Sequence, residues 1–432
     1  MEHHRVGLDP LRTSTPRAGM IMLLLFLLFE YLRLHAILPI LGALQVQTVV
    51  TAALLLIVIA QTARGGVHLS RQSWLFLGFL GLAVFTIIAA TNQFRAYQFA
   101  YGLSLTLIGF FAITHIVQNE RDLRRFLSLL VSIHIYLATR VILGYNPAGF
   151  NPQGYATAFS AGSYFLGDEN DVALAMTVIL PLAIHLLRQN RSSLGRLFWG
   201  AGSVVILLSI IFTFSRGGFI GLTALLLYWV VTSKNRGKAF GILCMIVALV
   251  VIVAPSRYWE RMETIQDTDS GTAMRRRDNW AAARRMFYDS PIWGVGGNNF
   301  GVLLPEYSIG YSEEQRPTQW GRASHSMYFD LMAMFGLVGM LLIGSVLVLN
   351  FRDLRLVSVV RLEGDRSGSI GHLADSLRLS LVGFLVPAAF LSVLGYPHLY
   401  YLTALIVVVR RLALAESTQV AIEPMGVLER TQ

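Results

Sequence analysis

Residues 197–232 read LFWGAGSVVILLSIIFTFSRGGFIGLTALLLYWVVT. The stretch holds one apolar run at 197–214 and a second from 219, with Arg216 between them and almost no connecting loop. An arginine between two membrane helices lies at or just below an interface, where a charge is costly and usually functional. The alternative interpretation is an arginine that ends a helix and extends its charged group to the interface.

Apolar stretches of this kind recur along nearly the whole chain. Hydrophobic residues make up 54% and charged residues 14%, against about 25% charged residues in soluble domains. The composition therefore predicts an all-α polytopic membrane protein with about twelve transmembrane helices. The predicted stretches are 19–33, 36–60, 73–91, 97–117, 123–143, 170–187, 196–214, 217–232, 238–254, 324–349, 376–394 and 398–413.

These stretches divide the chain into three parts. Residues 1–254 hold about nine spans, residues 255–323 form one large outer loop in which short helices are expected, and residues 324–432 hold the last spans and a cytoplasmic tail. The first stretch follows a basic segment but has no small-residue cleavage site, so we expect it to remain as a span. The single cysteine, Cys244, excludes an internal disulfide framework and a four-cysteine metal site. A P-loop motif is absent from the sequence.

The basic residues predict the orientation. With a cytoplasmic N-terminus, 22 of the 35 lysines and arginines fall in inner segments, and each of the four short outer links holds only one. Positive charge concentrates on the cytoplasmic side of membrane proteins, so both termini are predicted to be cytoplasmic. The net charge of +10 then follows from topology and attraction to lipid headgroups, without nucleic-acid binding.

The outer loop carries nine arginines and nine acidic residues, with their charges segregated. Residues 275–285 contain five arginines and only one acid, Asp278, within a predicted helix at 273–288. A guanidinium keeps its charge and donates paired hydrogen bonds, which suits it to hold a diphosphate at a membrane surface. The alternative is an interfacial amphipathic helix whose arginines contact lipid phosphates.

Two further polar groups flank predicted spans on the outer side. His325 begins the span after the loop, where an imidazole can act as a general base or orient a hydroxyl; it could equally be an interfacial residue beside a Ser324 helix cap. The sixth span begins with the acidic sequence GDEND at residues 167–171. Their carboxylates suit a helix N-terminus, while Asp168 and Asp171 could instead position an acceptor or pair with Arg216.

Five motifs in this order resemble the O-antigen ligase and polymerase superfamily of bacterial envelope glycan enzymes. They are TFSRGG at 213–218, RRDNW at 276–280, DSPIWGVGGNNF at 289–300, HSMY at 325–328 and FGLVG at 335–339. The resembling region covers about 200–345. The resemblance implies an inner-membrane enzyme that transfers a glycan from undecaprenyl diphosphate to an acceptor hydroxyl on the periplasmic face, with no metal, nucleotide or other cofactor.

The resemblance also implies roles for individual residues. Arg216 and Arg276 correspond to diphosphate-binding arginines and His325 to an essential histidine, and these three form the predicted catalytic set. The register within the arginine triplet stays open, and Arg276 is preferred because an arginine commonly precedes the tryptophan by four residues. Substrate contacts are expected from a wider group, namely Arg275, Arg277, Trp280, Asp168, Asp171 and Tyr328.

The acceptor separates the remaining hypotheses. Ligase-type transfer to lipid A–core is favoured because the histidine directly follows the loop, with an O-antigen or exopolysaccharide polymerase and a protein O-oligosaccharyltransferase as alternatives. Membrane lipids are the other expected partners. A transporter is the rival from a different class, but it should have matching broken helices in its two halves. Here only one half carries a long outer loop.

Overall fold

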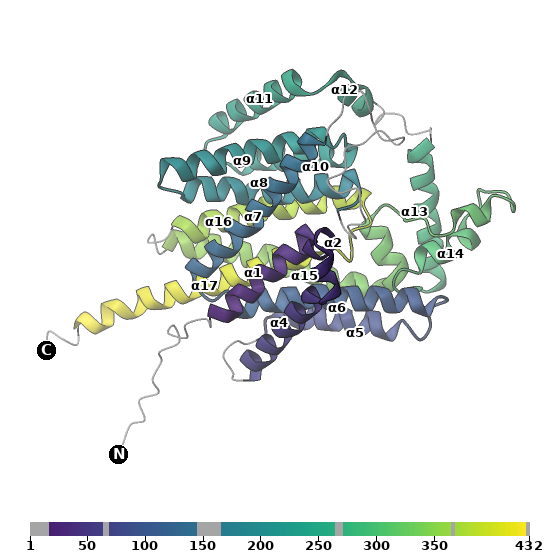
Figure 1. Ribbon diagram of the computed structural model, residues 1–432, viewed down its shortest axis with the longest axis horizontal. Helices are drawn as coiled ribbons and strands as arrows, with labels where there is room; N and C mark the ends of the chain where they lie inside the picture. Colours follow the sequence, from purple (N-terminus) through teal and green to yellow (C-terminus); the bar gives the residue numbers. More distant parts are fainter. Residues whose placement is uncertain (1–16, 64–68, 145–165, 264–270, 364–367, 429–432) are drawn as a thin grey trace, which may run out of the picture.

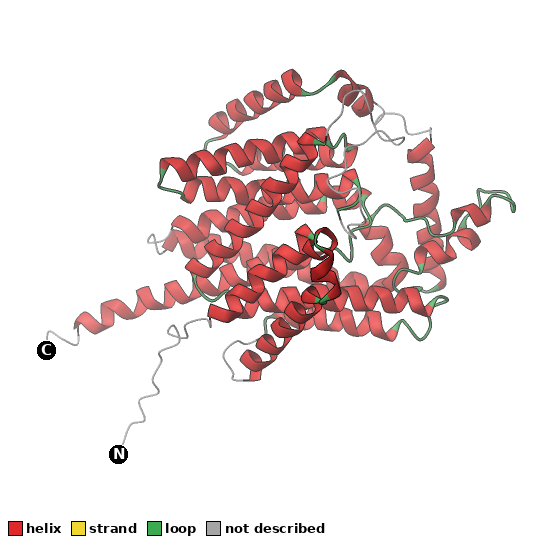
Figure 2. Ribbon diagram, in the orientation of Figure 1, coloured by secondary structure: helices red, strands yellow, loops and turns green. Residues whose placement is uncertain are grey.

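The computed structural model describes residues 17–63, 69–144, 166–263, 271–363 and 368–428. In these ranges the regular elements are helices and no strand occurs, as Figure 2 shows, which confirms the predicted all-α class. In chain order the elements are α1 Arg17–Leu32, α2 Leu34–Ile37, α3 Pro39–Ala43, α4 Val46–Ala63, α5 Arg71–Phe85, α6 Gln93–Ile116, α7 Glu120–Leu143, α8 Glu169–Gln189, α9 Ser193–Phe212, α10 Arg216–Thr232, α11 Arg236–Val253, α12 Ser256–Glu263, α13 Gly271–Asp289, α14 Phe300–Tyr307, η1 Arg316–Gln319, α15 Met327–Glu363, α16 Gly368–Leu385, η2 Pro387–Phe390 and α17 Pro397–Leu428.

Nine helices of the described ranges are long and apolar enough to cross a membrane: α4, α6, α7, α8, α9, α11, α15, α16 and α17. The predicted stretches 19–33, 73–91 and 217–232 correspond to the shorter helices α1, α5 and α10. A multi-pass membrane protein is therefore supported, while the count of twelve spans stays a prediction. The same holds for the orientation of the two termini.

The long helices lie side by side in one bundle (Figure 1). Helix α8 is central. It packs against α9 and α16, and 78% of the residues in its most apolar 18-residue stretch are buried. Helix α11 is peripheral, because only 11% of the residues in its most apolar stretch are buried. Its exposed apolar side chains are suited to face lipid. Helices α12, α13 and α14 gather at one end of the bundle, and α1 begins and α17 ends toward the other end (Figure 1).

Three predicted spans differ from the observed helices. The stretch 36–60 is interrupted between α3 and α4, where Gln45 has φ 51°. The stretch 324–349 is not one continuous helix, because Gly336 inside α15 has φ 56° and ψ −155° and separates two helical segments. The stretch 376–394 begins earlier, at Gly368, and α16 ends at Leu385. The sequence around Gly336 is apolar throughout, so hydropathy could not locate that break.

Side-chain caps fix where many helices begin. A cap oxygen accepts a hydrogen bond from the backbone N–H two or three residues later, which satisfies a donor that the helix leaves unpaired. The capping residues are Ser70, Asn92, Asn119, Asp168, Ser192, Ser215 and Asn235. Two of them, Asp168 and Ser215, start α8 and α10 beside one another and so determine where the first polar side chains of these helices lie.

Candidate active site

The junction between α9 and α10 is a tight turn that presents Arg216. Phe214 adopts a left-handed conformation with φ 54°, and Ser215 then caps α10 by accepting a hydrogen bond from the Gly218 N–H at 2.9 Å. A Cβ atom on Gly218 would lie 2.5 Å from the Cβ of Ala173, so glycine permits α10 to pack closely on α8. Arg216 is thereby the first residue of α10 and is half-buried.

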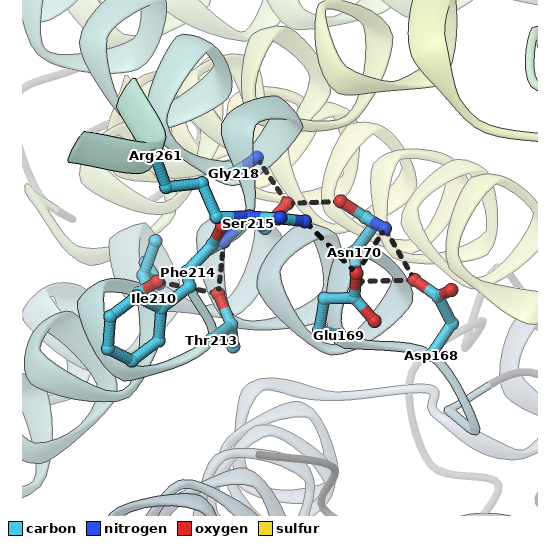
Figure 3. A network of polar contacts seen from close by, with 9 residues as sticks. All are labelled: Asp168, Glu169, Asn170, Ile210, Thr213, Phe214, Ser215, Gly218 and Arg261. Atoms are coloured by element: carbon cyan, nitrogen blue, oxygen red, sulfur yellow. Dashed lines mark hydrogen bonds and ion pairs between the residues drawn. The ribbon is translucent and has the colours of Figure 1, made fainter. Parts of the chain in front are cut away.

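The start of α8 is bound to this junction, as Figure 3 shows. The Ser215 hydroxyl donates to Asn170 Oδ1 at 2.7 Å. Asp168 caps α8 by accepting from the Asn170 N–H and from its Nδ2, both at 2.6 Å. The capping interpretation of Asp168 is therefore confirmed. Because Asn170 contacts both elements, the carboxylates of α8 and the first turn of α10 are held in one rigid polar network.

Arg261 of α12 joins the network from the outer loop. Its Nε donates to the Phe214 carbonyl oxygen at 3.0 Å, and its Nη2 lies 3.8 Å from Glu169 Oε1 (Figure 3). Sequence reasoning did not single out this residue. Its only signal is the position within a short helix directly after the last span of the first half, and its partners come from segments far away in the sequence.

Helix α13 holds the segment that carries His325. Asn279 Nδ2 donates to the Ala323 carbonyl oxygen at 2.9 Å, and Trp280 Nε1 donates to the Ser324 carbonyl oxygen at 3.0 Å. The Trp280 ring also stacks on Phe329, with ring centroids 5.1 Å apart. These contacts place the arginine-bearing helix directly against the start of α15.

His325 has a left-handed backbone with φ 56°, a conformation that is uncommon for residues other than glycine. Its N–H donates to Ser392 Oγ at 3.1 Å, and Ser324 forms a turn whose hydroxyl accepts from the Ser326 N–H at 3.0 Å. Helix α15 begins at Met327, so Ser324 is a turn residue and not the helix cap.

The electrostatic environment of His325 favours the neutral form of its imidazole. Atoms packed around the ring lower the pKa of His325, and the guanidinium of Arg276 lowers it further, while the Asp168 carboxylate acts in the opposite direction. The residue nevertheless stays solvent-accessible. A neutral, accessible imidazole can accept a proton, which a permanently charged one could not do.

Arg216, Arg261 and Arg276 form what we call the arginine cluster. Burial lowers the pKa of Arg276, and the positive charges of Arg216 and Arg261 lower it further, whereas Asp168 and Glu169 raise it. The Arg276 Nε is buried and has no hydrogen-bond acceptor among the described residues. Three guanidiniums concentrated in this way favour a ligand with more than one negative charge.

The arginine triplet resolves into one inward and two outward side chains. Arg276 is half-buried, whereas Arg275 and Arg277 are exposed. The structure thus brings Arg216, Arg276, His325 and Asp168 together in one electrostatic environment and does not place Arg275 with them.

The other predicted substrate contacts have protein partners. Tyr396 Oη donates to Asp171 Oδ2 at 3.0 Å, and Tyr328 Oη donates to the Leu385 carbonyl oxygen at 2.7 Å. With the Trp280 contacts above, these bonds point to positioning roles. Within the described ranges, no group of three or more His, Cys, Asp or Glu side chains is placed to hold a metal ion.

The motif at 289–300 packs against α15, the helix that follows His325. Its backbone donates from Val295 and Gly296 to the carbonyl oxygens of Ala333 and Met334, at 2.9 and 3.0 Å. Gly336 makes this docking possible, because a Cβ there would lie 2.6 Å from the Ile292 carbonyl oxygen. The glycines of both motifs therefore serve close backbone packing.

Comparison with known proteins gives a family match for the segment that holds most of the site. No curated protein matches the chain. Residues 201–344, a third of the chain, match the family model described as O-antigen ligase. This segment contains the α9–α10 junction, α12, α13 and His325. Residues 201–344 are therefore similar to the O-antigen ligase family, which supports the resemblance to that superfamily over this segment.

Proposed function

We propose that this protein transfers a glycan from undecaprenyl diphosphate to a hydroxyl of lipid A–core, as an O-antigen ligase, without a metal ion or a nucleotide. The observation that carries the proposal is the arginine cluster close to His325, an accessible histidine whose pKa is lowered by burial and by Arg276. The arginines suit a diphosphate leaving group, and the histidine suits a hydroxyl nucleophile. Transfer from a lipid diphosphate to a hydroxyl would use both groups, one to stabilise the leaving diphosphate and one to accept the proton of the hydroxyl.

The arginine cluster would bind the donor diphosphate and stabilise its departure. As the bond between the anomeric carbon and the diphosphate oxygen breaks, that oxygen keeps the electron pair and gains negative charge. Fixed guanidiniums in a partly dehydrated site stabilise such a charge without reorganising. Arg276 suits this role because its Nε is buried without an acceptor among the described residues.

His325 would activate the acceptor. The acceptor oxygen attacks the anomeric carbon, and its proton moves to the imidazole as the new glycosidic bond forms. The resulting imidazolium then releases the proton to solvent, which the accessible ring permits. Asp168 favours the transient imidazolium, because its carboxylate raises the pKa of His325.

The proposal places the site on the periplasmic side of the inner membrane, with both termini cytoplasmic. Two observations support it. The loop helices α12, α13 and α14 gather at the same end of the bundle (Figure 1), and Arg261 of α12 contacts the α9–α10 junction. A lipid-linked donor could then reach the site from the bilayer with its diphosphate at the interface.

Reconstitution tests the proposal. Purified protein is mixed with an undecaprenyl diphosphate-linked glycan and lipid A–core, in EDTA and without ATP, and the products are separated by mass. Glycan on lipid A–core supports the proposal. Arg284→Gln serves as the control variant, because Arg284 is an exposed arginine on the same helix as Arg276.

Other products would point to a different acceptor. Longer lipid-linked glycan would identify a polymerase, and glycan on an added acceptor protein would identify a protein O-oligosaccharyltransferase. A protein that fails to bind the donor would refute the transferase proposal and favour transport.

A further inference from the structure

A cavity of about 310 Å³ lies next to the segment that carries His325, and Arg322 and Ala323 of that segment line it. It is lined by residues of α6, of the segment 298–301 at the start of α14, of the segment 321–323, of α15 and of the segment 392–396. Its volume is at the lower end of the range for small-molecule sites. None of the residues assigned above to the arginine cluster lines it, so it is distinct from the diphosphate site.

The cavity combines cationic, polar and apolar walls. Arg95 and Arg322 supply two guanidiniums, and the one acidic residue in the lining, Asp330, is buried. Arg95 lies over the Trp320 ring, 4.7 Å from its centroid, and Arg322 Nε donates to the Thr318 carbonyl oxygen at 3.1 Å. Among the described residues, no carboxylate forms an ion pair with either arginine. The two fixed guanidiniums are therefore available to an anionic ligand.

Neutral polar groups accompany the arginines. Gln98, Asn298 and Tyr396 line the same cavity, together with the aromatic rings of Phe99 and Phe300. Amides and hydroxyls beside aromatic faces suit a sugar, which presents hydroxyls at its edge and C–H groups on its faces. A lipid chain would need a continuous apolar groove instead.

The walls are held by backbone contacts. The Gly321 N–H donates to the Gly301 carbonyl oxygen at 2.8 Å, and a Cβ on Gly301 would lie 2.7 Å from the Arg322 carbonyl oxygen. Asn299 Oδ1 accepts from the Asn92 N–H at 2.7 Å, and its Nδ2 donates to the Asn92 carbonyl oxygen at 3.1 Å. These contacts fix the positions of the backbone segments that carry Arg95 and Arg322.

The cavity shares a wall with the candidate active site. Ser392 lines the cavity and accepts the His325 N–H at 3.1 Å. Tyr396 lines it too and donates to Asp171, which is three residues after the Asp168 cap of α8. A ligand that contacts Ser392 in the cavity would therefore lie one residue away from His325.

We propose that this cavity is the acceptor subsite and that it binds an acidic sugar, one that carries a phosphate or a carboxylate group. Arg95 and Arg322 hold the anionic group, and the sugar hydroxyl is presented past Ser392 to His325. The role of the cavity as an acceptor subsite rests on the proposed function. The binding of an acidic sugar there does not depend on it.

Direct binding tests the inference. Calorimetric titration of the purified protein uses three oligosaccharides with one backbone: a phosphorylated form, a form with a uronic acid, and a neutral form. We expect the acidic forms to bind and Arg95→Ala/Arg322→Ala to weaken their binding about 10- to 100-fold, since bonds to charged groups are being lost. The controls are Arg284→Ala and the charge-conserving Arg95→Lys/Arg322→Lys.

The comparison of the two acidic forms identifies the source of the charge. Tighter binding of the phosphorylated form assigns a phosphosugar, and tighter binding of the uronic acid form assigns a carboxylated sugar. Equal binding of the neutral form, wild-type binding by the double alanine variant, or displacement of the sugars by anionic phospholipid vesicles would overturn the inference.

A donor-binding measurement separates this inference from the proposed function. Undecaprenyl diphosphate should bind the double alanine variant as it binds the wild type, because neither arginine belongs to the arginine cluster. If acidic sugars bind and no glycan transfer occurs with any acceptor, the proposed function fails and the acidic-sugar site remains. If transfer occurs and acidic sugars do not bind, the subsite fails alone.

Discussion

Replacement of Arg276 by glutamine should change both the rate of glycan transfer and its pH dependence. Arg276 is half-buried beside two other guanidiniums. Loss of one fixed donor to a developing anion typically costs about 100- to 1,000-fold in rate, or about 2.7–4 kcal/mol. Because Arg216 and Arg261 remain, we expect a loss near the lower end of that range.

The pH dependence provides a second and independent signature. A general base must be neutral, so transfer rises as the pH increases through the pKa of His325. The Arg276 charge lowers the pKa of His325, and its removal therefore raises that pKa and moves the acid limb to higher pH. Asp168 raises the pKa of His325, so Asp168→Asn should lower that pKa and move the acid limb of the pH profile to lower pH. Asparagine can still cap α8.

The assay is kcat/KM for glycan transfer, measured across about pH 5 to 8, where imidazoles titrate. This parameter reports groups of the free enzyme. Arg284→Gln, on the exposed face of the same helix, should leave both the rate and the limb unchanged. Wild-type kcat/KM in Arg276→Gln, or acid limbs that coincide in all variants, would refute the reasoning.

Three other substitutions test the supporting structure. Ser392→Ala removes the acceptor of the His325 N–H and should lower kcat/KM about tenfold, in line with an unsatisfied donor, with recovery in Ser392→Thr; unchanged kinetics would remove Ser392 from the site. Gly336→Ala introduces a Cβ at φ 56°, 2.6 Å from the Ile292 carbonyl oxygen, and should cost about 1–3 kcal/mol or more of stability, measured as a lower Tm in detergent; an unchanged Tm would contradict the kink. Arg261→Ala breaks the contacts of α12 to the α9–α10 junction and should lower transfer, with partial recovery in Arg261→Lys; full activity would exclude Arg261 from the arginine cluster.

Hydropathy predicted the all-α class and the positions of most long helices, because a membrane requires long apolar helices. Each of the twelve predicted apolar stretches overlaps at least one helix, although 36–60, 324–349 and 376–394 differ from the observed boundaries. The helix predicted at 273–288 is α13, Gly271–Asp289. The break at Gly336 escaped notice since the surrounding sequence, MFGLVG, is apolar throughout. Its cause is the docking of residues 291–296, a tertiary contact that no local pattern contains.

The sequence predicted some residues of the candidate site and missed others. Arg216, the arginine triplet and His325 stood out because charged or titratable groups flank apolar stretches there. Arg261 and the acidic-sugar cavity did not, because each depends on segments that are distant in the sequence. Trp280 was expected to contact substrate, whereas its indole N–H donates to the Ser324 carbonyl oxygen. A tryptophan looks the same in sequence whether it binds a ligand or holds a loop.

Donor binding tests the central claim most directly, since it separates the role of the arginines from that of His325. The affinity for an undecaprenyl diphosphate-linked glycan is measured for the wild type, Arg216→Ala/Arg276→Ala and His325→Ala. We predict that the double variant loses donor binding, while His325→Ala binds the donor like the wild type and transfers no glycan. Wild-type donor affinity in the double variant would contradict the assignment of the arginine cluster to the diphosphate.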